Sequence, residues 1–221
     1  MSRSTRSSIR LVTGGATATL AYPALVVLLQ LIQHGHYHPM SQAISELALG
    51  RQGWLMMVAF CLLAAGTFIV TALTREVTQA RVAPGLLGVS GLLTVVSAFV
   101  HTDGSNRSSL HGQIHVAAGI VTFVVIIAAM FLLAGPLRAM PVWRRLGTAT
   151  RALAILGVLA FFFVPVFGDK YMGLAQRCLI GLLVGWLAFT QLYARRVFTT
   201  RMQSSQSVQP HPQPRQTHPS A

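Results

Sequence analysis

The residues of this chain that could do chemistry gather in three short polar segments that separate long apolar ones. Six of the eight histidines and three of the four acidic residues fall in these segments. Imidazole and carboxylate groups bind metal ions and transfer protons, and they are costly near hydrocarbon, so their gathering indicates a functional site. The set comprises His34, His36, His38, His101, His111, His115, Glu46, Asp103 and Asp169.

Residues 101–115 carry the sharpest of these signals. His111 and His115 stand four positions apart, which places both rings on one face of a helix that begins near Ser109. Two imidazoles at this spacing can bind one zinc ion, and Asp103 from the same segment is a candidate third ligand. Histidines four apart at a helix end also commonly hydrogen-bond to neighbouring loops, so a zinc site and a structural role both remain open.

The first polar segment, residues 34–50, contains candidate catalytic side chains. Ser41 is placed to cap a short helix that Gly50 ends, and the apolar residues between them favour a helix lying at the membrane surface. Ser45 and Glu46 would then lie near the mouth of the bundle. In a hydrolase, Glu46 would act as general base and Ser45 would stabilise the developing oxyanion. The three alternating histidines before this helix are equally compatible with metal binding and with simple solvation.

The third polar segment, residues 167–177, leads into the last apolar stretch. Asp169 is a second candidate general base. Arg177 lies just inside the stretch, where a lone guanidinium is costly, so it is expected to pair with Asp103 or Asp169 or to bind a lipid phosphate. The alternative is an interfacial arginine that reaches back to water. Arg177 and its neighbour Gln176 are therefore the candidate substrate-binding residues.

The composition identifies the elements that must hold these segments. Of 221 residues, 53% are hydrophobic and only 10% are charged, whereas a soluble domain has about 25% charged residues. The chain is therefore expected to be an integral membrane protein in contact with membrane lipids. A formal net charge of +13 would suggest nucleic-acid binding in a soluble protein. Here the arginines lie between apolar stretches, so we expect no nucleic-acid partner.

Six apolar stretches are long enough to cross a bilayer core of about 30 Å as helices. They cover residues 11–32, 54–73, 84–100, 113–137, 149–167 and 174–194. We therefore predict an all-α fold, a polytopic six-transmembrane-helix bundle over residues 11–197. Residues 1–10 would form a cytoplasmic N-terminus, and residues 198–221, dense in Gln, Ser and Pro, would form a disordered cytoplasmic tail.

The basic residues predict the orientation of the bundle. Thirteen of the 17 Lys and Arg residues lie on the same side of the predicted bundle as both termini. Because cytoplasmic loops carry the excess of positive charge, both termini are expected in the cytoplasm and the histidine-rich segments on the extracytoplasmic side. Arginine supplies all but one of these 17 residues. This bias is typical of GC-rich bacterial genomes and favours a bacterial inner (plasma) membrane location.

Small residues predict where helices approach one another closely. Gly85, Gly88 and Gly91 recur every third residue in the third stretch, without the preceding strand that a nucleotide-binding fingerprint requires. Gly181 and Gly185 form a G-x-x-x-G pair in the sixth stretch. Both patterns favour close helix contacts, either within one chain or between copies in a homo-oligomer.

Four patches of this sequence resemble the six-helix membrane family catalogued as domain of unknown function 998, and the resemblance covers residues 10–197. The patches are Ser41-x-x-x-Ser45-Glu46 followed by Gly50-x-x-Gly53-Trp54, the pair Thr102-Asp103, His111-Gly112-x-x-His115, and Gly173-x-x-Gln176-Arg177. The resemblance implies a six-helix fold with the site on one membrane face, and no settled activity. In the family pattern prolines flank the Thr-Asp pair, where this chain has His101 and Gly104, so the resemblance does not imply His101 as a ligand.

Two functions follow from these residues. One is a metal-dependent hydrolase of lipid or lipid-linked substrates, in which Asp103, His111 and His115 hold a zinc ion that activates water. The other is a non-enzymatic membrane protein that binds lipid or supports membrane assembly, with the same polar groups stiffening one end of the bundle. Metal analysis of the purified protein separates the two. A transporter is disfavoured, because none of the predicted spans has a charge at its centre.

Overall fold

The computed structural model of the protein describes residues 3–104, 109–166 and 168–207. These residues form an all-α fold of six long helices and two short 3-10 helices, and they contain no strand. The long helices are α1 (Arg3–Ile32), α2 (Trp54–Thr78), α3 (Val82–Phe99), α4 (Leu110–Ala139), α5 (Arg144–Val166) and α6 (Gly168–Ser207). The 3-10 helices are η1 (Ile44–Leu49) and η2 (Pro141–Trp143).

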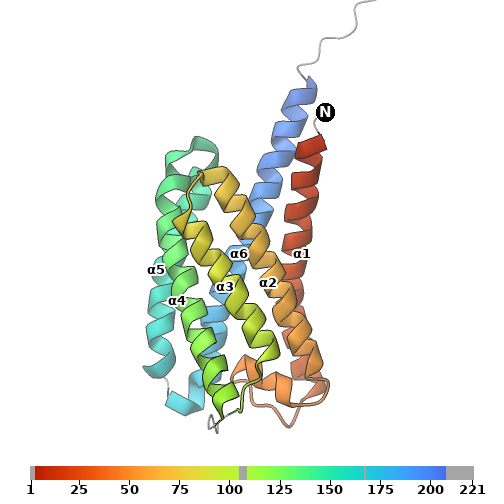
Figure 1. The fold of residues 1–221 in the computed structure, drawn as a ribbon, viewed down its shortest axis with the longest axis vertical. Coiled ribbons are helices and arrows are strands. Elements are labelled where there is room, and N and C mark those ends of the chain that lie inside the picture. Colours follow the sequence, from red (N-terminus) through yellow and green to blue (C-terminus); the bar gives the residue numbers. More distant parts are fainter. Residues whose placement is uncertain (1–2, 105–108, 167, 208–221) are drawn as a thin grey trace, which may run out of the picture.

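The long helices form a bundle in which each packs against the next along the chain, and α6 returns to pack against α1 (Figure 1). All six are long and apolar enough to cross a membrane. Helices suit that environment because their backbone polar groups are satisfied internally. The predicted all-α fold with six membrane-spanning helices is confirmed.

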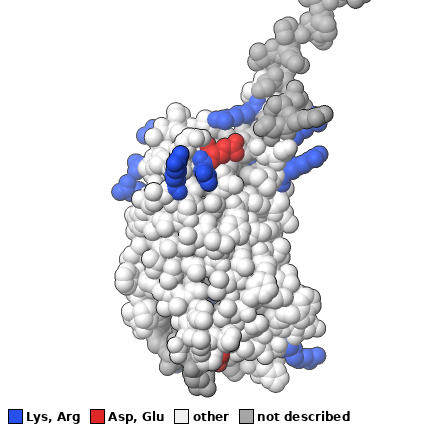
Figure 2. Space-filling model, in the orientation of Figure 1, with Lys and Arg blue, Asp and Glu red and all other residues white. Residues whose placement is uncertain are grey.

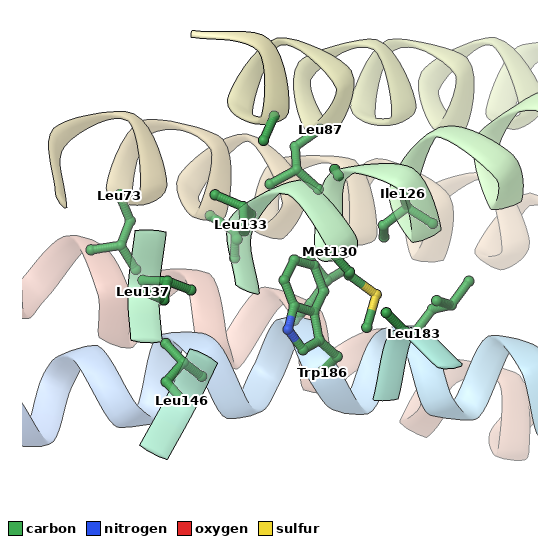
Figure 3. Packing of buried hydrophobic residues seen from close by; sticks show 14 of the residues in the cluster. Leu73, Leu87, Ile126, Met130, Leu133, Leu137, Leu146, Leu183 and Trp186 are labelled. Atoms are coloured by element: carbon green, nitrogen blue, oxygen red, sulfur yellow. The ribbon is translucent and has the colours of Figure 1, made fainter. Parts of the chain in front are cut away.

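The centre of the bundle is filled by large apolar side chains from all six long helices. Figure 3 shows Met130 and Leu133 of α4 packed near Trp186 of α6, and all three side chains are buried. The Trp186 indole is also satisfied, because its Nε1 donates a hydrogen bond to Thr150 Oγ1 at 3.0 Å. Lipid tails are as apolar as these side chains, so close packing rather than the hydrophobic effect holds such helices together.

The glycine patterns have two different outcomes. A Cβ at Gly91 would lie 2.7 Å from the Phe68 ring, so this glycine allows α3 to approach α2 as predicted. A Cβ at Gly181 or Gly185 would meet no described atom within 4 Å. The G-x-x-x-G pair of α6 therefore faces away from the rest of its own bundle, in contrast to the close packing within the chain that it also suggested.

Both described ends of the chain lie at one end of the bundle, and η1 lies at the other (Figure 1). On the face that Figure 2 shows, Lys and Arg side chains gather at the end with the termini, and few lie at the opposite end. Helix α6 continues to Ser207. The segment expected to be a disordered tail is therefore helical from residue 198 to that point, and residues 208–221 lie outside the described part of the chain.

Candidate functional site

The polar segments predicted to carry the chemistry meet at one end of the bundle, at the bottom of Figure 1. We call this the histidine end, and its described residues are 33–53, 100–104, 109–115 and 168–177. Within it, η1 contacts α1, α2 and α6. Its Ile44 and Leu47 side chains are buried. The apolar face of η1 therefore anchors the first polar segment among the membrane-spanning helices.

Arg177 fastens this first segment to α6. Its Nη1 donates hydrogen bonds to the carbonyl oxygens of Pro39 at 2.6 Å, Gln42 at 3.0 Å and Gly173 at 2.8 Å. Its Nη2 donates to the Tyr37 hydroxyl, which itself donates to carbonyls of the same segment. These contacts favour a positioning role for Arg177 over phosphate binding, and its substrate-binding role stays a prediction.

Helix α6 can approach the first segment closely because Gly173 has no side chain. A Cβ at this position would lie 2.4 Å from the carbonyl oxygen of Gln42 and 2.6 Å from that of Pro39. Gln176 makes a further contact, because its Oε1 accepts a hydrogen bond from the Ile44 amide at 3.0 Å. Together with the arginine beside it, Gln176 therefore sets the position of η1.

The side chain of Glu46 caps η1, although Glu46 is itself a residue of this helix. Its Oε1 accepts a hydrogen bond from the Ala43 amide, and its Oε2 accepts one from Gln42 Nε2, both at 3.0 Å. The N-cap of η1 is Ala43, so the prediction that Ser41 caps this helix is wrong. The physical reason is that the Ala43 and Ile44 amides, to which a capping Ser41 hydroxyl would have bonded, already donate to Glu46 Oε1 and Gln176 Oε1.

Asp103 is held at the N-terminus of α4. Its Oδ2 accepts a hydrogen bond from the Ser109 amide and its Oδ1 accepts one from the Ser109 hydroxyl, both at 2.8 Å. Helix α4 begins beside Ser109, as expected, and Ser109 caps it, because its Oγ accepts a hydrogen bond from the Gly112 amide at 3.1 Å. A Cβ at Gly112 would lie 2.3 Å from Asp103 Oδ2, so only glycine allows this approach. The hydrogen bonds from Ser109 lower the pKa of the Asp103 carboxyl.

The two histidines of α4 lie in different surroundings. His115 is buried, its Nδ1 lies 2.7 Å from the Val100 carbonyl oxygen, and its ring meets Phe60 edge-on at 6.3 Å between centroids. His111 is exposed. Among the described residues, no three His, Cys, Asp or Glu side chains form a group that could hold a metal ion. The structure therefore does not gather Asp103 with the two histidines as ligands, and the zinc site stays a prediction.

The other histidines of the predicted set and Asp169 also lie at the histidine end. His34, His36, His38 and His101 are exposed at the histidine end. Asp169 lies in the first turn of α6, and its side chain lies outside the described part of the structure.

A cavity of about 610 Å³ extends from the histidine end into the bundle. Its polar side chains that lie nearest η1 are Tyr22, Ser45, Glu46, Ser97, Thr102, His115 and Gln176. The deeper walls are formed mainly by apolar residues such as Phe123 and Leu183. The deeper hydroxyls of Thr67, Ser90 and Thr94 donate to carbonyls of their own helices. The cavity therefore combines a polar part beside η1 with a mainly apolar interior, in which the buried hydroxyl of Thr122 has no hydrogen-bond partner among the described residues.

Three hydroxyl groups in the polar part have no hydrogen-bond partner among the described residues. They belong to Tyr22, Ser45 and Ser97, whose side chains are only 2%, 8% and 8% exposed. Each of these hydroxyls can therefore donate or accept a hydrogen bond with a molecule bound in the cavity. Sequence reasoning missed Tyr22 and Ser97. The recurrence of Ser90, Thr94 and Ser97 at helical spacing could have indicated a polar stripe along α3.

A family model described as "Protein of unknown function (DUF998)" matches residues 16–192 of the chain. No curated protein and no solved structure matches the chain. Every residue that lines the cavity, from Tyr22 to Leu187, falls within the range that the family model matches.

Proposed function

The chain belongs to the DUF998 family of proteins of unknown function, as its sequence patches predict, and for this integral membrane protein we propose a role in binding a membrane amphiphile at the histidine end. The observation that carries the proposal is the cavity of about 610 Å³, with its polar part beside η1 and its apolar interior. Small-molecule ligands occupy cavities of about 300–1,000 Å³. The cavity therefore has the size and the polarity gradient that a lipid-like ligand requires.

The arrangement of side chains supports an entry route from the membrane. The apolar chain of a bound amphiphile would lie against Phe123 and Leu183, with its head group near Ser45. Ile120 and Phe162 also line the cavity, yet they keep 49% and 67% of their surface exposed. Because these exposed side chains are apolar, a hydrocarbon chain can pass them without leaving an apolar environment.

Gly119 allows a direct test of this proposal. It lines the cavity, and a Cβ there would meet no described atom within 4 Å, so the side chain of Gly119→Leu starts from an open position and adds bulk to the cavity. Gly135 is a matched control, because it lies on the same helix in equally open space and does not line the cavity. We expect native mass spectrometry to show a copurifying lipid on the wild type and on Gly135→Leu, and to show its loss from Gly119→Leu. Equal lipid occupancy in both variants would contradict the proposal.

A hydrolase of lipid or lipid-linked substrates is the second candidate, because Ser45, Glu46 and His115 line the same cavity. In this proposal Glu46 acts as general base toward water, with Asp169 as the alternative base, and Ser45 stabilises the oxyanion. Turnover of a fluorogenic lipid ester should fall at least about a hundredfold in Glu46→Gln. If the wild type releases no product, the hydrolase proposal fails. A zinc-dependent form of it further requires that purified protein retains about one equivalent of metal and that His115→Ala releases it.

We also propose that the histidine end faces the extracytoplasmic side of a bacterial inner membrane, with both termini in the cytoplasm. The support is the position of the basic residues, because Arg75, Arg81, Arg138 and Arg144 lie at the helix ends opposite the histidine end. Positive charge is retained on the cytoplasmic side during membrane insertion. The cavity would then open toward the outer leaflet.

The outward-facing Gly181 and Gly185 support a further proposal, that copies of the chain associate through α6. Small residues let helix backbones approach closely in lipid. Chemical crosslinking in native membranes, with a reagent that does not form disulfides, should yield a dimer of the wild type. Gly181→Leu should abolish the dimer. An unchanged dimer yield in this variant would contradict the proposed contact.

A further inference from the structure

The charge of the cavity indicates which head group it accepts. Among the described residues that line it, Glu46 is the only acidic side chain, and none is Lys or Arg. Hydrogen bonds from the Ala43 amide and Gln42 Nε2 hold the Glu46 carboxylate in place. Its Oε2 lies 3.7 Å from the point that a Cβ at Gly104 would occupy, where the second polar segment meets the first. A fixed negative charge on the cavity wall attracts a cation and repels an anion.

Several of the neighbouring polar groups can accept hydrogen bonds. The Val100 carbonyl can only accept, so His115 Nδ1 at 2.7 Å must carry the hydrogen, and Nε2 of the neutral ring is then an acceptor. The unpartnered hydroxyls of Ser45 and Ser97 can also accept. The rings of Tyr22 and Phe60, with centroids 5.9 Å apart, add aromatic surface to the same part of the cavity. Aromatic faces attract ammonium groups.

The nearest basic side chain is not available to a phosphate. Arg177 does not line the cavity, and its Nη1 and Nη2 are engaged by Pro39, Gln42, Gly173 and Tyr37. Its Nε has no hydrogen-bond partner among the described residues but is buried, so a phosphate in the cavity does not meet this guanidinium in the arrangement that the structure shows.

From these observations we infer that the cavity selects an amphiphile with a cationic, hydrogen-bond-donating head group, such as a protonated long-chain amine, and rejects one with a phosphate head group. The ammonium pairs with the Glu46 carboxylate and donates hydrogen bonds to His115 and the free hydroxyls, while the hydrocarbon chain fills the apolar interior. This inference rests on the proposed amphiphile-binding function and adds the identity of the head group.

Three ligands with the same twelve-carbon chain isolate the head group. Dodecylamine, which is protonated at neutral pH, dodecanol and dodecyl phosphate are offered in equal amounts to delipidated protein, and native mass spectrometry measures the occupancy of each. We expect the amine to bind about tenfold more tightly than the alcohol, because its hydrogen bonds are charge-assisted, and the phosphate to bind more weakly than both. Glu46→Gln should lower the affinity for the amine to that for the alcohol, and it should leave the affinity for the alcohol unchanged.

Glu76→Gln is the matched control, because Glu76 is an exposed glutamate near the far end of α2 and does not line the cavity. It should behave as wild type. If Glu46→Gln fails to fold, as judged by thermal denaturation, the wild-type preference among the three ligands decides. Equal binding of phosphate and amine overturns the head-group inference, and so does equal binding of alcohol and amine, while amphiphile binding stands. If none of the three binds, the proposed function itself fails, and the inference with it.

Discussion

Arg177 and Tyr37 lie against each other across the histidine end, although 140 positions separate them in the chain. The Arg177 guanidinium lies 5.4 Å from the centroid of the Tyr37 ring, and its Nη2 donates a hydrogen bond to the Tyr37 hydroxyl. Burial raises the pKa of the Tyr37 phenol, while the nearby guanidinium acts in the opposite direction. A phenol that keeps its proton can donate to the Ala43 carbonyl at 2.9 Å. The pair therefore joins α6 to residues 37–43 of the first polar segment.

Replacing Arg177 tests whether these contacts stabilise the protein. Arg177→Leu removes the donors to three carbonyls and to Tyr37, so we expect the unfolding free energy to fall by about 2–3 kcal/mol. Arg177→Lys keeps the charge and part of the hydrogen bonding, so it should lose less. SDS-induced unfolding measures both, with Arg195→Leu, an exposed arginine nearer the other end of α6, as the control. If both changes at Arg177 leave the unfolding free energy as unchanged as the control does, the arginine merely reaches toward water.

Gly173→Ala tests the close approach of α6 to the first segment. The added Cβ would lie within 2.6 Å of two carbonyl oxygens, and backbone atoms cannot move aside cheaply. We expect a loss of about 1–3 kcal/mol in unfolding free energy from this overpacking. Gly135→Ala on α4 meets no described atom within 4 Å, so it should be neutral or should stabilise by up to about 1 kcal/mol. The same change in unfolding free energy at both glycines would show that the approach is loose.

The Asp103 carboxylate predicts a pH dependence. Hydrogen bonds from Ser109 hold its pKa below the ordinary value of 3.8 in the folded state. A depressed carboxyl pKa contributes stability that is present above the ordinary value and is lost as the pH falls through the lowered pKa. Asp103→Asn should therefore denature at a lower temperature than wild type at pH 6, and the difference should narrow as the pH falls below 3.8. A constant difference between them across this range would mean that the charge of Asp103 plays no part.

Cysteine labelling tests the proposed orientation. In a background in which Cys61 and Cys178 are replaced by alanine, His36→Cys places a thiol at the exposed histidine end, and Arg81→Cys places one at the exposed opposite end. Because positive charge stays on the cytoplasmic side, an impermeant thiol reagent should label the first variant in intact cells and the second only after lysis. The reverse labelling pattern would invert the orientation.

Much of the architecture could be predicted from the sequence because hydrocarbon imposes simple rules. A bilayer requires long apolar helices, so hydropathy alone locates six of them and leaves the polar residues in the segments between. The start of α4 was also predictable, because the capping of a helix by Ser109 depends on local contacts. The cap of η1 was not, since the Glu46 carboxylate reaches back three residues and displaces Ser41 from that role.

The roles of the site residues depend on contacts that no local pattern contains. The spacing of apolar and polar residues is enough to place His115, Glu46 and Arg177 at one end of a membrane bundle. The packed helices are needed to show that His115 hydrogen-bonds to Val100, that Arg177 binds carbonyls more than 130 positions away, and that Tyr22 and Ser97 line one cavity. The physical reason is that the rotation of each helix about its axis is set by packing against its neighbours, and this rotation decides whether a polar side chain meets lipid, a backbone carbonyl or a cavity.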